Sequence, residues 1–131
     1  MHNQDAFAIL PSTTLNATWN SAQLQADYYN AAYLVVVTSA IGAGQGITHI
    51  VQIPHPYSWE SGWIDVATAP AHSVETTYVH FFGYGAAEGV STGTDIVSKV
   101  ECVIPKLWRV RMELTNSEDI TVAAYVVPCI I

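Results

Sequence analysis

The sequence has few charged residues, and very few of those are basic. Only 11% of the 131 residues are charged while 50% are hydrophobic, whereas an ordinary soluble domain carries about 25% charged residues. The formal net charge is −7, and the four basic residues all fall within the segment 99–111: Lys99, Lys106, Arg109 and Arg111. Nucleic-acid binding requires a broad basic face for phosphate contacts, so we expect no direct binding of nucleic acid.

Long apolar runs are also absent. A membrane-spanning helix needs about 18 or more consecutive apolar residues, and the longest runs here, such as 33–37, have the length of a strand. The first residues, MHNQD, lack the basic start and apolar core of a secretory signal, so we expect none. Low charge without a membrane segment favours a soluble subunit that buries part of its surface in a homo- or hetero-oligomer.

The sequence offers little catalytic chemistry. It has no Gly-x-Ser-x-Gly nucleophile motif, and its two cysteines, Cys102 and Cys129, match neither a metal motif nor a disulfide-rich scaffold. The glycine-rich stretch IGAGQGI at 41–47 is followed by a strand-like run instead of the helix that a phosphate loop requires, which indicates a turn. We therefore expect no enzymatic activity, no cofactor and reduced, buried thiols.

The five histidines lack the spacing of a metal motif. Metal-binding jelly rolls of the cupin type use two histidines one residue apart followed by a glutamate, and this pattern is absent. We interpret each histidine as a packed or interfacial residue and predict no metal site: His2, His49, His55, His72 and His80.

Short runs rich in Val, Ile, Thr and aromatic residues dominate the chain, with turn residues between them. This pattern predicts a single all-β domain over residues 1–131, an antiparallel β-sandwich of jelly-roll type. Residues 1–12 are expected to form an N-terminal arm and residues 128–131 an apolar C-terminal tail. The predicted strands cover residues 13–19, 33–40, 47–53, 63–68, 76–84, 94–104, 107–115 and 120–127.

Alternation of side chains assigns faces to the last two strands. In LWRVRMEL, at 107–114, Trp108, Val110 and Met112 are predicted to face the core, with Arg109 and Arg111 on the other face. The strand 120–127 is apolar on both faces, which indicates that both are covered. The polar turn 116–119 between these strands predicts a C-terminal hairpin.

We infer a docking surface from these two strands and the tail. Apolar burial would supply the affinity, and the arginines would fix the register against a partner. The residues assigned to this interface are Arg109, Arg111, Tyr125, Val127, Ile130 and Ile131.

The segment 54–66 combines aromatic and acidic residues, a mixture that sugar-binding sites use. Its aromatic residues Tyr57, Trp59 and Trp63 could contact a glycan, or they could fold back over the end of the sandwich. A carbohydrate-binding module is therefore an alternative function from a different class.

The segment IPKLWRVRMELTNSEDITVAAYVV, at 104–127, resembles the ends of small virion proteins encoded among the head genes of tailed bacteriophages. The stretch TTLNATWNSAQLQADYYNAAYLVVVTSA, at 13–40, is similar to the arrangement near their start. The resemblance implies a cement or decoration protein on the capsid surface, made in the host cytoplasm, which contacts the major capsid protein and assembles as a trimer. A head-to-tail or tail structural protein is the alternative within the virion.

Overall fold

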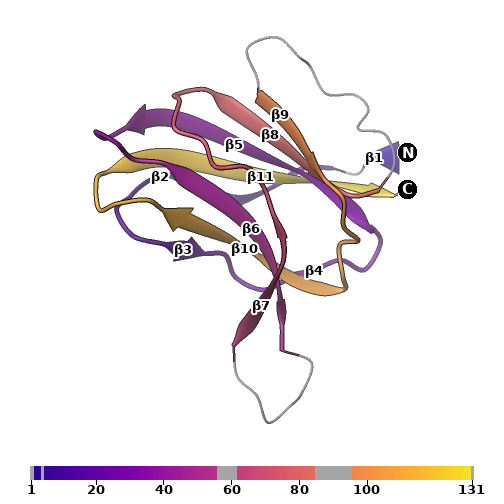
Figure 1. Ribbon diagram of the computed structural model, residues 1–131. Helices are drawn as coiled ribbons and strands as arrows, with labels where there is room; N and C mark the ends of the chain where they lie inside the picture. The colour runs from indigo at the N-terminus through magenta and orange to yellow at the C-terminus, as the bar shows by residue number, and fades with distance from the viewer. Residues whose placement is uncertain (1, 4, 56–61, 85–95, 131) are drawn as a thin grey trace.

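The computed structural model describes residues 2–3, 5–55, 62–84 and 96–130 (Figure 1). Within these ranges the chain forms strands, turns and bends without a helix, so they contain no helix that could cross a membrane. The strands are β1 (His2–Asn3), β2 (Phe7–Leu15), β3 (Trp19–Asn20), β4 (Leu24–Gln25), β5 (Ala31–Ile41), β6 (Ile47–Pro54), β7 (Trp63–Thr68), β8 (Thr77–Phe82), β9 (Ile96–Val100), β10 (Leu107–Leu114) and β11 (Ile120–Ile130).

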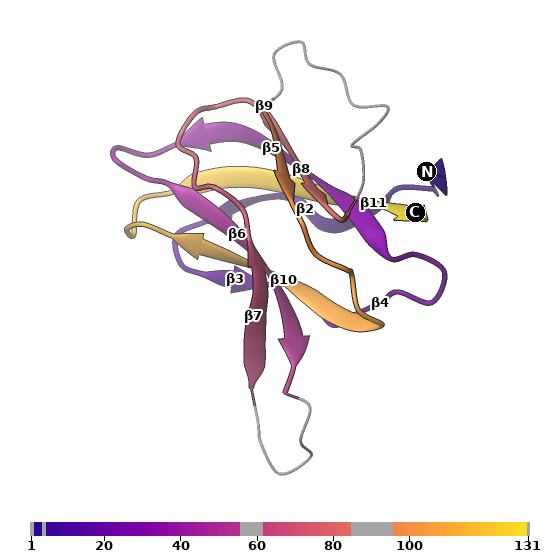
Figure 2. The same cartoon turned by 45° about the vertical axis from the view of Figure 1, so that its right-hand side comes forward.

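The strands form two sheets that pack face to face (Figures 1 and 2). The six-stranded sheet has the order β1-β11-β5-β8-β9, with β2 also paired to β11. The five-stranded sheet has the order β3-β10-β6-β7, with β4 also paired to β10. The predicted all-β sandwich is thus confirmed, whereas a jelly-roll topology stays a prediction. One pair, β8 with β9, is parallel, so the sandwich is not wholly antiparallel.

The predicted C-terminal hairpin is wrong. Strand β10 pairs with β6, β3 and β4, whereas β11 pairs with β5, β2 and β1, so the two strands belong to different sheets. The turn 115–119 therefore crosses from one sheet to the other. A strand that is apolar on both faces favours a central place in a sheet, and β11 has one between β2 and β5.

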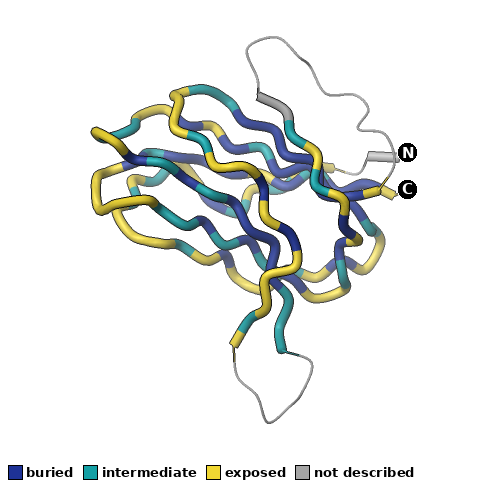
Figure 3. Tube along the Cα trace, in the orientation of Figure 1, coloured by how far each residue is buried: buried dark blue, intermediate teal, exposed yellow. Residues whose placement is uncertain are grey.

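The core lies between the sheets and follows the predicted alternation (Figure 3). On β10, Trp108, Val110 and Met112 are fully buried, and Trp108 donates its indole N–H to the hydroxyl oxygen of Tyr29. The even-numbered positions 120–126 of β11 are also buried. Cys102 is buried as expected, but it follows β9 and is not part of it.

Both ends of the chain enter the six-stranded sheet. Residues 7–12, expected as part of an arm, belong to β2, which pairs with β11. The expected tail continues β11 as far as Ile130, with Pro128 and Cys129 buried and Ile130 43% exposed. Ile131 lies outside the described residues.

Candidate functional site

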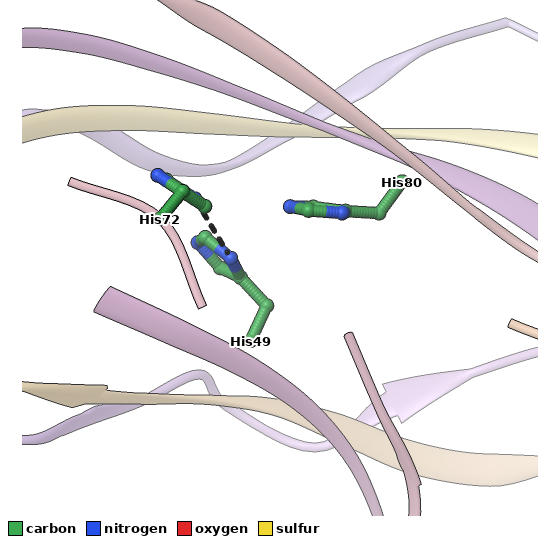
Figure 4. Close-up of side chains that lie close together, drawn as sticks. All are labelled: His49, His72 and His80. Carbon is green, nitrogen blue, oxygen red and sulfur yellow. Dashed lines mark hydrogen bonds between the residues drawn. The ribbon is translucent and has the colours of Figure 1, made fainter. Parts of the chain in front are cut away.

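Three of the five histidines meet in the interior of the sandwich (Figure 4). His49 projects from β6 of the five-stranded sheet, and His80 projects from β8 of the six-stranded sheet. Both are buried, with exposed fractions of 0% and 1%. His72 lies in the segment between β7 and β8 and is half-buried. We call His49, His72 and His80 the histidine cluster.

Backbone hydrogen bonds hold His72 against β6. Its backbone N–H donates to the carbonyl oxygen of Ile47 at 3.0 Å, and the Ile47 N–H donates to the His72 carbonyl at 2.9 Å. The N–H of Ala69 donates to the carbonyl oxygen of His49 at 2.9 Å. These bonds fold the segment after β7 back along β6, so that His72 lies beside His49.

One ligand nitrogen from each ring lies within 4.8 Å of those of the other two. His72 Nε2 is 3.3 Å from His49 Nδ1, and these two rings stack at a centroid distance of 5.0 Å. The His80 ring points from the opposite sheet towards the other two, as Figure 4 shows. The cluster therefore joins both layers of the sandwich at one point.

The ring nitrogens have fewer partners than they need. His80 Nδ1 is 2.5 Å from the Ser98 hydroxyl oxygen, but His49 Nε2, His72 Nδ1 and His80 Nε2 are buried without a hydrogen-bond partner. A neutral imidazole has one N–H and one acceptor nitrogen. If His72 Nε2–H donates to His49 Nδ1, the proton of His49 is on its Nε2, which has no acceptor. If His49 Nδ1–H donates instead, the proton of His72 is on its Nδ1, which has no acceptor either. Such a group costs about 1–3 kcal/mol.

Burial keeps all three imidazoles neutral at pH 7. Desolvation lowers the pKa of His72 from 6.5 to about 3, with a smaller contribution from His80, and lowers the pKa of His80 to about 4. Desolvation, followed by the nearby His80 and His72, lowers the pKa of His49 well below its usual value. The neutral form is the one that can bind a metal ion.

The sequence interpretation took the histidines one at a time and did not predict the cluster. It expected packed side chains, which His49 and His80 are, with Tyr78 and Phe82 also buried on the inner face of β8. A signal was present, because His49 and His80 both fall on core-facing positions of their strands. Polar residues at such positions need partners, but the pairing of the strands that brings them together is not encoded in their spacing.

The described residues of the predicted interface do not all lie together. Arg109 and Arg111 lie on the outer face of the five-stranded sheet, whereas Tyr125 and Val127 lie on the outer face of the six-stranded sheet. These faces look away from each other across the sandwich. These four residues therefore belong to two separate surfaces.

Arg109 and Arg111 have partners within the chain. The guanidinium of Arg109 lies 4.2 Å from the centroid of the Trp63 ring, and its Nε–H donates to Gln52 Oε1 at 2.8 Å. Arg111 forms an ion pair with Glu113 at 3.1 Å. Partial desolvation and the nearby Arg111 lower the pKa of Arg109.

Only one of the three aromatic residues assigned to glycan binding is described. Tyr57 and Trp59 lie outside the described residues. Trp63 begins β7 at the base of the segment, and Arg109 covers one face of its ring. That face is thus not available for stacking on a sugar.

The outer face of the six-stranded sheet is apolar over its three central strands. It presents a row of side chains from each strand: Ala31, Tyr33, Val35 and Val37 from β5; Thr77, Val79 and Phe81 from β8; and Ala123, Tyr125, Val127 and Cys129 from β11. None of them is charged. Val37 and Tyr125 are 37% and 39% exposed, and Val35 and Val127 are partly buried. We call these four residues the outer apolar patch.

Comparison with known protein families and with curated proteins finds no match for this chain.

Proposed function

We propose that this protein is a non-enzymatic structural subunit that acts by burying the outer apolar patch against neighbouring subunits. The observation that carries the proposal is the outer apolar patch, which stays at least partly exposed on the six-stranded sheet, whereas Tyr33, Val79 and Phe81 on the same face are buried within the chain. Antiparallel sheets with one solvated face ordinarily alternate apolar and polar side chains. Here both faces are apolar at the centre of the sheet, as expected for a sheet with a covered outer face.

The geometry of the patch suits association. Tyr125 pairs with Val35, and Val37 and Val127 each lie two residues from this pair on the same face, so the four side chains of the patch are adjacent. Aromatic residues are enriched in interface cores and charged residues are depleted there. We expect a closed homo-oligomer around this patch, with a trimer favoured.

The setting that we propose is a virion shell. The sequence resemblance to phage head proteins supports a cement or decoration protein that bridges major capsid subunits, with a head-to-tail or tail structural protein as the alternative. The two outer faces of the sandwich give such a subunit two contacts. One face would bind copies of the same chain, and the other, with Arg109 and Arg111, would bind the shell.

Sedimentation of the isolated protein tests the homo-oligomer. We expect a concentration-dependent oligomer at micromolar concentration, and we expect Val37→Lys and Tyr125→Lys to shift it to monomer, because each places a charge in the interface. Both side chains are exposed, so the variants should keep the fold. Val74→Lys changes another exposed apolar residue, 56% exposed and outside the patch, and should sediment as the wild type. A wild-type monomer would contradict the proposed contact.

The virion setting has a separate test. Mass spectrometry of purified tailed-phage particles from the source of this chain should detect it at a fixed stoichiometry to the major capsid protein. Its absence from the particles would reject the capsid role, and recovery with isolated tails would support the tail alternative.

A further inference from the structure

The histidine cluster is too costly for a group that only fills space. Each of its rings keeps one buried nitrogen without a partner, and the pair His49 and His72 keeps a buried N–H without an acceptor in either tautomer. Apolar side chains of similar size would fill the same volume without this cost. Three neutral imidazoles that each bring a nitrogen within 4.8 Å of the other two form a donor set, which suggests a ligand that binds imidazole nitrogens.

The distances fit a small metal ion. Zinc binds histidine nitrogens at about 2.0–2.1 Å in tetrahedral geometry, which places two such nitrogens about 3.3 Å apart. The His72 Nε2 to His49 Nδ1 distance is 3.3 Å. One nitrogen of each ring lies within 4.8 Å of those of the other two, so movements of about 1.5 Å or less would bring each pair of nitrogens to this spacing.

His80 has a hydrogen-bond partner at one of its two ring nitrogens. Its Nδ1 is 2.5 Å from the Ser98 hydroxyl oxygen. If Nδ1–H donates to that oxygen, Nε2 carries the lone pair, and Nε2 lies on the side of the ring that faces the other two histidines (Figure 4). In a histidine that binds a metal ion through one ring nitrogen, the other ring nitrogen ordinarily donates a hydrogen bond of this kind, which fixes the tautomer and the ring orientation.

We propose that His49, His72 and His80 bind one divalent transition-metal ion of the zinc class, which ties the two sheets of the sandwich together. Three imidazoles without a carboxylate favour zinc, copper, nickel or cobalt over magnesium or calcium. The fourth position of a tetrahedral ion goes to a non-protein ligand such as water. His72 also lines a surface cavity of about 230 Å³, so the cluster borders solvent on that side.

Titration of the metal-stripped protein with Co²⁺ tests the site directly. We expect the visible absorption bands of tetrahedral Co²⁺ to saturate at one ion per chain and to disappear when Zn²⁺ is added. Zn²⁺ in excess should raise the Tm by at least about 5 °C, and EDTA should reverse the shift. A folded wild-type protein that binds neither ion at tens of micromolar would overturn the proposal.

Two variants assign the binding to the cluster. His72→Phe keeps a flat ring beside Tyr78 but removes both nitrogens, and its fold is checked by its melt in EDTA. We expect it to lose the cobalt bands and at least about tenfold in zinc affinity. His55→Gln changes a histidine outside the cluster and should bind as the wild type. Unchanged binding by His72→Phe, or lost binding by His55→Gln, would contradict this assignment. These readouts are independent of the proposed oligomer.

Discussion

Gln45 connects the glycine-rich turn to the turn that joins the sheets. It is only 1% exposed. Its Nε2 donates to the carbonyl oxygens of Asn116 and Glu118 at 2.9 and 2.7 Å. Its Oε1 accepts the backbone N–H groups of Gly46, Thr115 and Asn116 at 3.0–3.1 Å. One buried amide thus satisfies five backbone groups in two turns. Gly44, with a φ of 69°, supplies the left-handed position within the glycine-rich turn.

We expect Gln45→Glu to lower the free energy of unfolding by about 3 kcal/mol or more. The substitution keeps the size of the side chain but points a carboxylate oxygen at two carbonyl oxygens and buries a charge. Urea denaturation at pH 7.5 measures the effect. The control Gln23→Glu makes the same chemical change at an exposed residue and should stay within about 0.5 kcal/mol of the wild type. Equal free energies of unfolding for the two variants would show that the Gln45 hydrogen bonds do not stabilise the fold.

At the scale of the element, the existence and faces of most strands follow from the sequence. The predicted strand 63–68 coincides with β7, and the predicted strands 47–53 and 107–115 differ from β6 and β10 by one residue at the C-terminal end. Alternating burial on β10 follows the predicted faces. These features depend on a period of two residues, which local sequence encodes.

Strand boundaries and partners near the N-terminus were less predictable. The predicted strand 13–19 is split, because Phe7–Leu15 joins the six-stranded sheet and Trp19–Asn20 joins the five-stranded sheet. The three residues between them, 16–18, mark a change of sheet. The polar turn 116–119 likewise marks a change of sheet and not a hairpin. Turn composition reports that the chain bends, but the sheet it enters next depends on the packing of the whole core.

The histidine cluster depends on the same long-range packing. His49, His72 and His80 come from one strand of each sheet and from the segment between β7 and β8. Sequence could identify two core-facing histidines, but only the pairing of β6 with the segment after β7, and the stacking of the two sheets, brings the three rings together.

Strands β10, β6 and β7 share a row of polar contacts on the outer face of their sheet. Arg109 donates to Gln52, and Gln52 Nε2 donates to Asp65 Oδ1 at 2.6 Å. The Arg109 guanidinium also stacks on Trp63. This row connects the ends of β6 and β7, which extend beyond the body of the sandwich, to β10 (Figure 2).

Substitution of Arg109 should therefore lower the stability of the isolated subunit more than substitution of Arg111. We expect Arg109→Ala to lower the free energy of unfolding by about 1–2 kcal/mol, because it removes a stacking contact and a hydrogen bond that orients Gln52. Arg111→Ala removes a partly exposed ion pair and should cost about 0–1 kcal/mol. Arg109→Lys should recover little, since lysine lacks the planar group. Urea denaturation of the three variants measures these differences. Equal losses in the free energy of unfolding for Arg109→Ala and Arg111→Ala would contradict this prediction.

At the scale of the whole molecule, the two sheets meet across a core that includes three uncharged imidazoles. Protonation of any one of them inside the core would place a charge among apolar and aromatic side chains. The folded state resists this protonation, as the lowered pKa values of His49, His72 and His80 indicate. The unfolded chain does not resist it, and the stability of the sandwich is therefore linked to pH.

The sign of this linkage follows from the direction of the shifts. Above about pH 6.5 the histidines are neutral in both states, so their protonation does not change the free energy of unfolding. As the pH falls below 6.5, the unfolded state takes up protons that the folded state does not accept until about pH 4 for His80 and about pH 3 for His72. Each such histidine then removes about 1.4 kcal/mol of stability per pH unit. The metal-free sandwich should thus lose stability steeply from pH 6.5 downwards.

Urea unfolding in EDTA at several pH values between 7.5 and 5.0 measures this loss. Chelation removes any stabilisation by bound metal, and the range lies above the pH at which carboxyl groups ordinarily titrate. His72→Phe deletes one of the three groups, so below pH 6.5 its free energy of unfolding should fall less steeply than that of the wild type, by up to about 1.4 kcal/mol per pH unit. A wild-type protein equally stable at pH 7.5 and 5.0 would show that the histidines accept protons in the folded state, and that water reaches the cluster between the sheets.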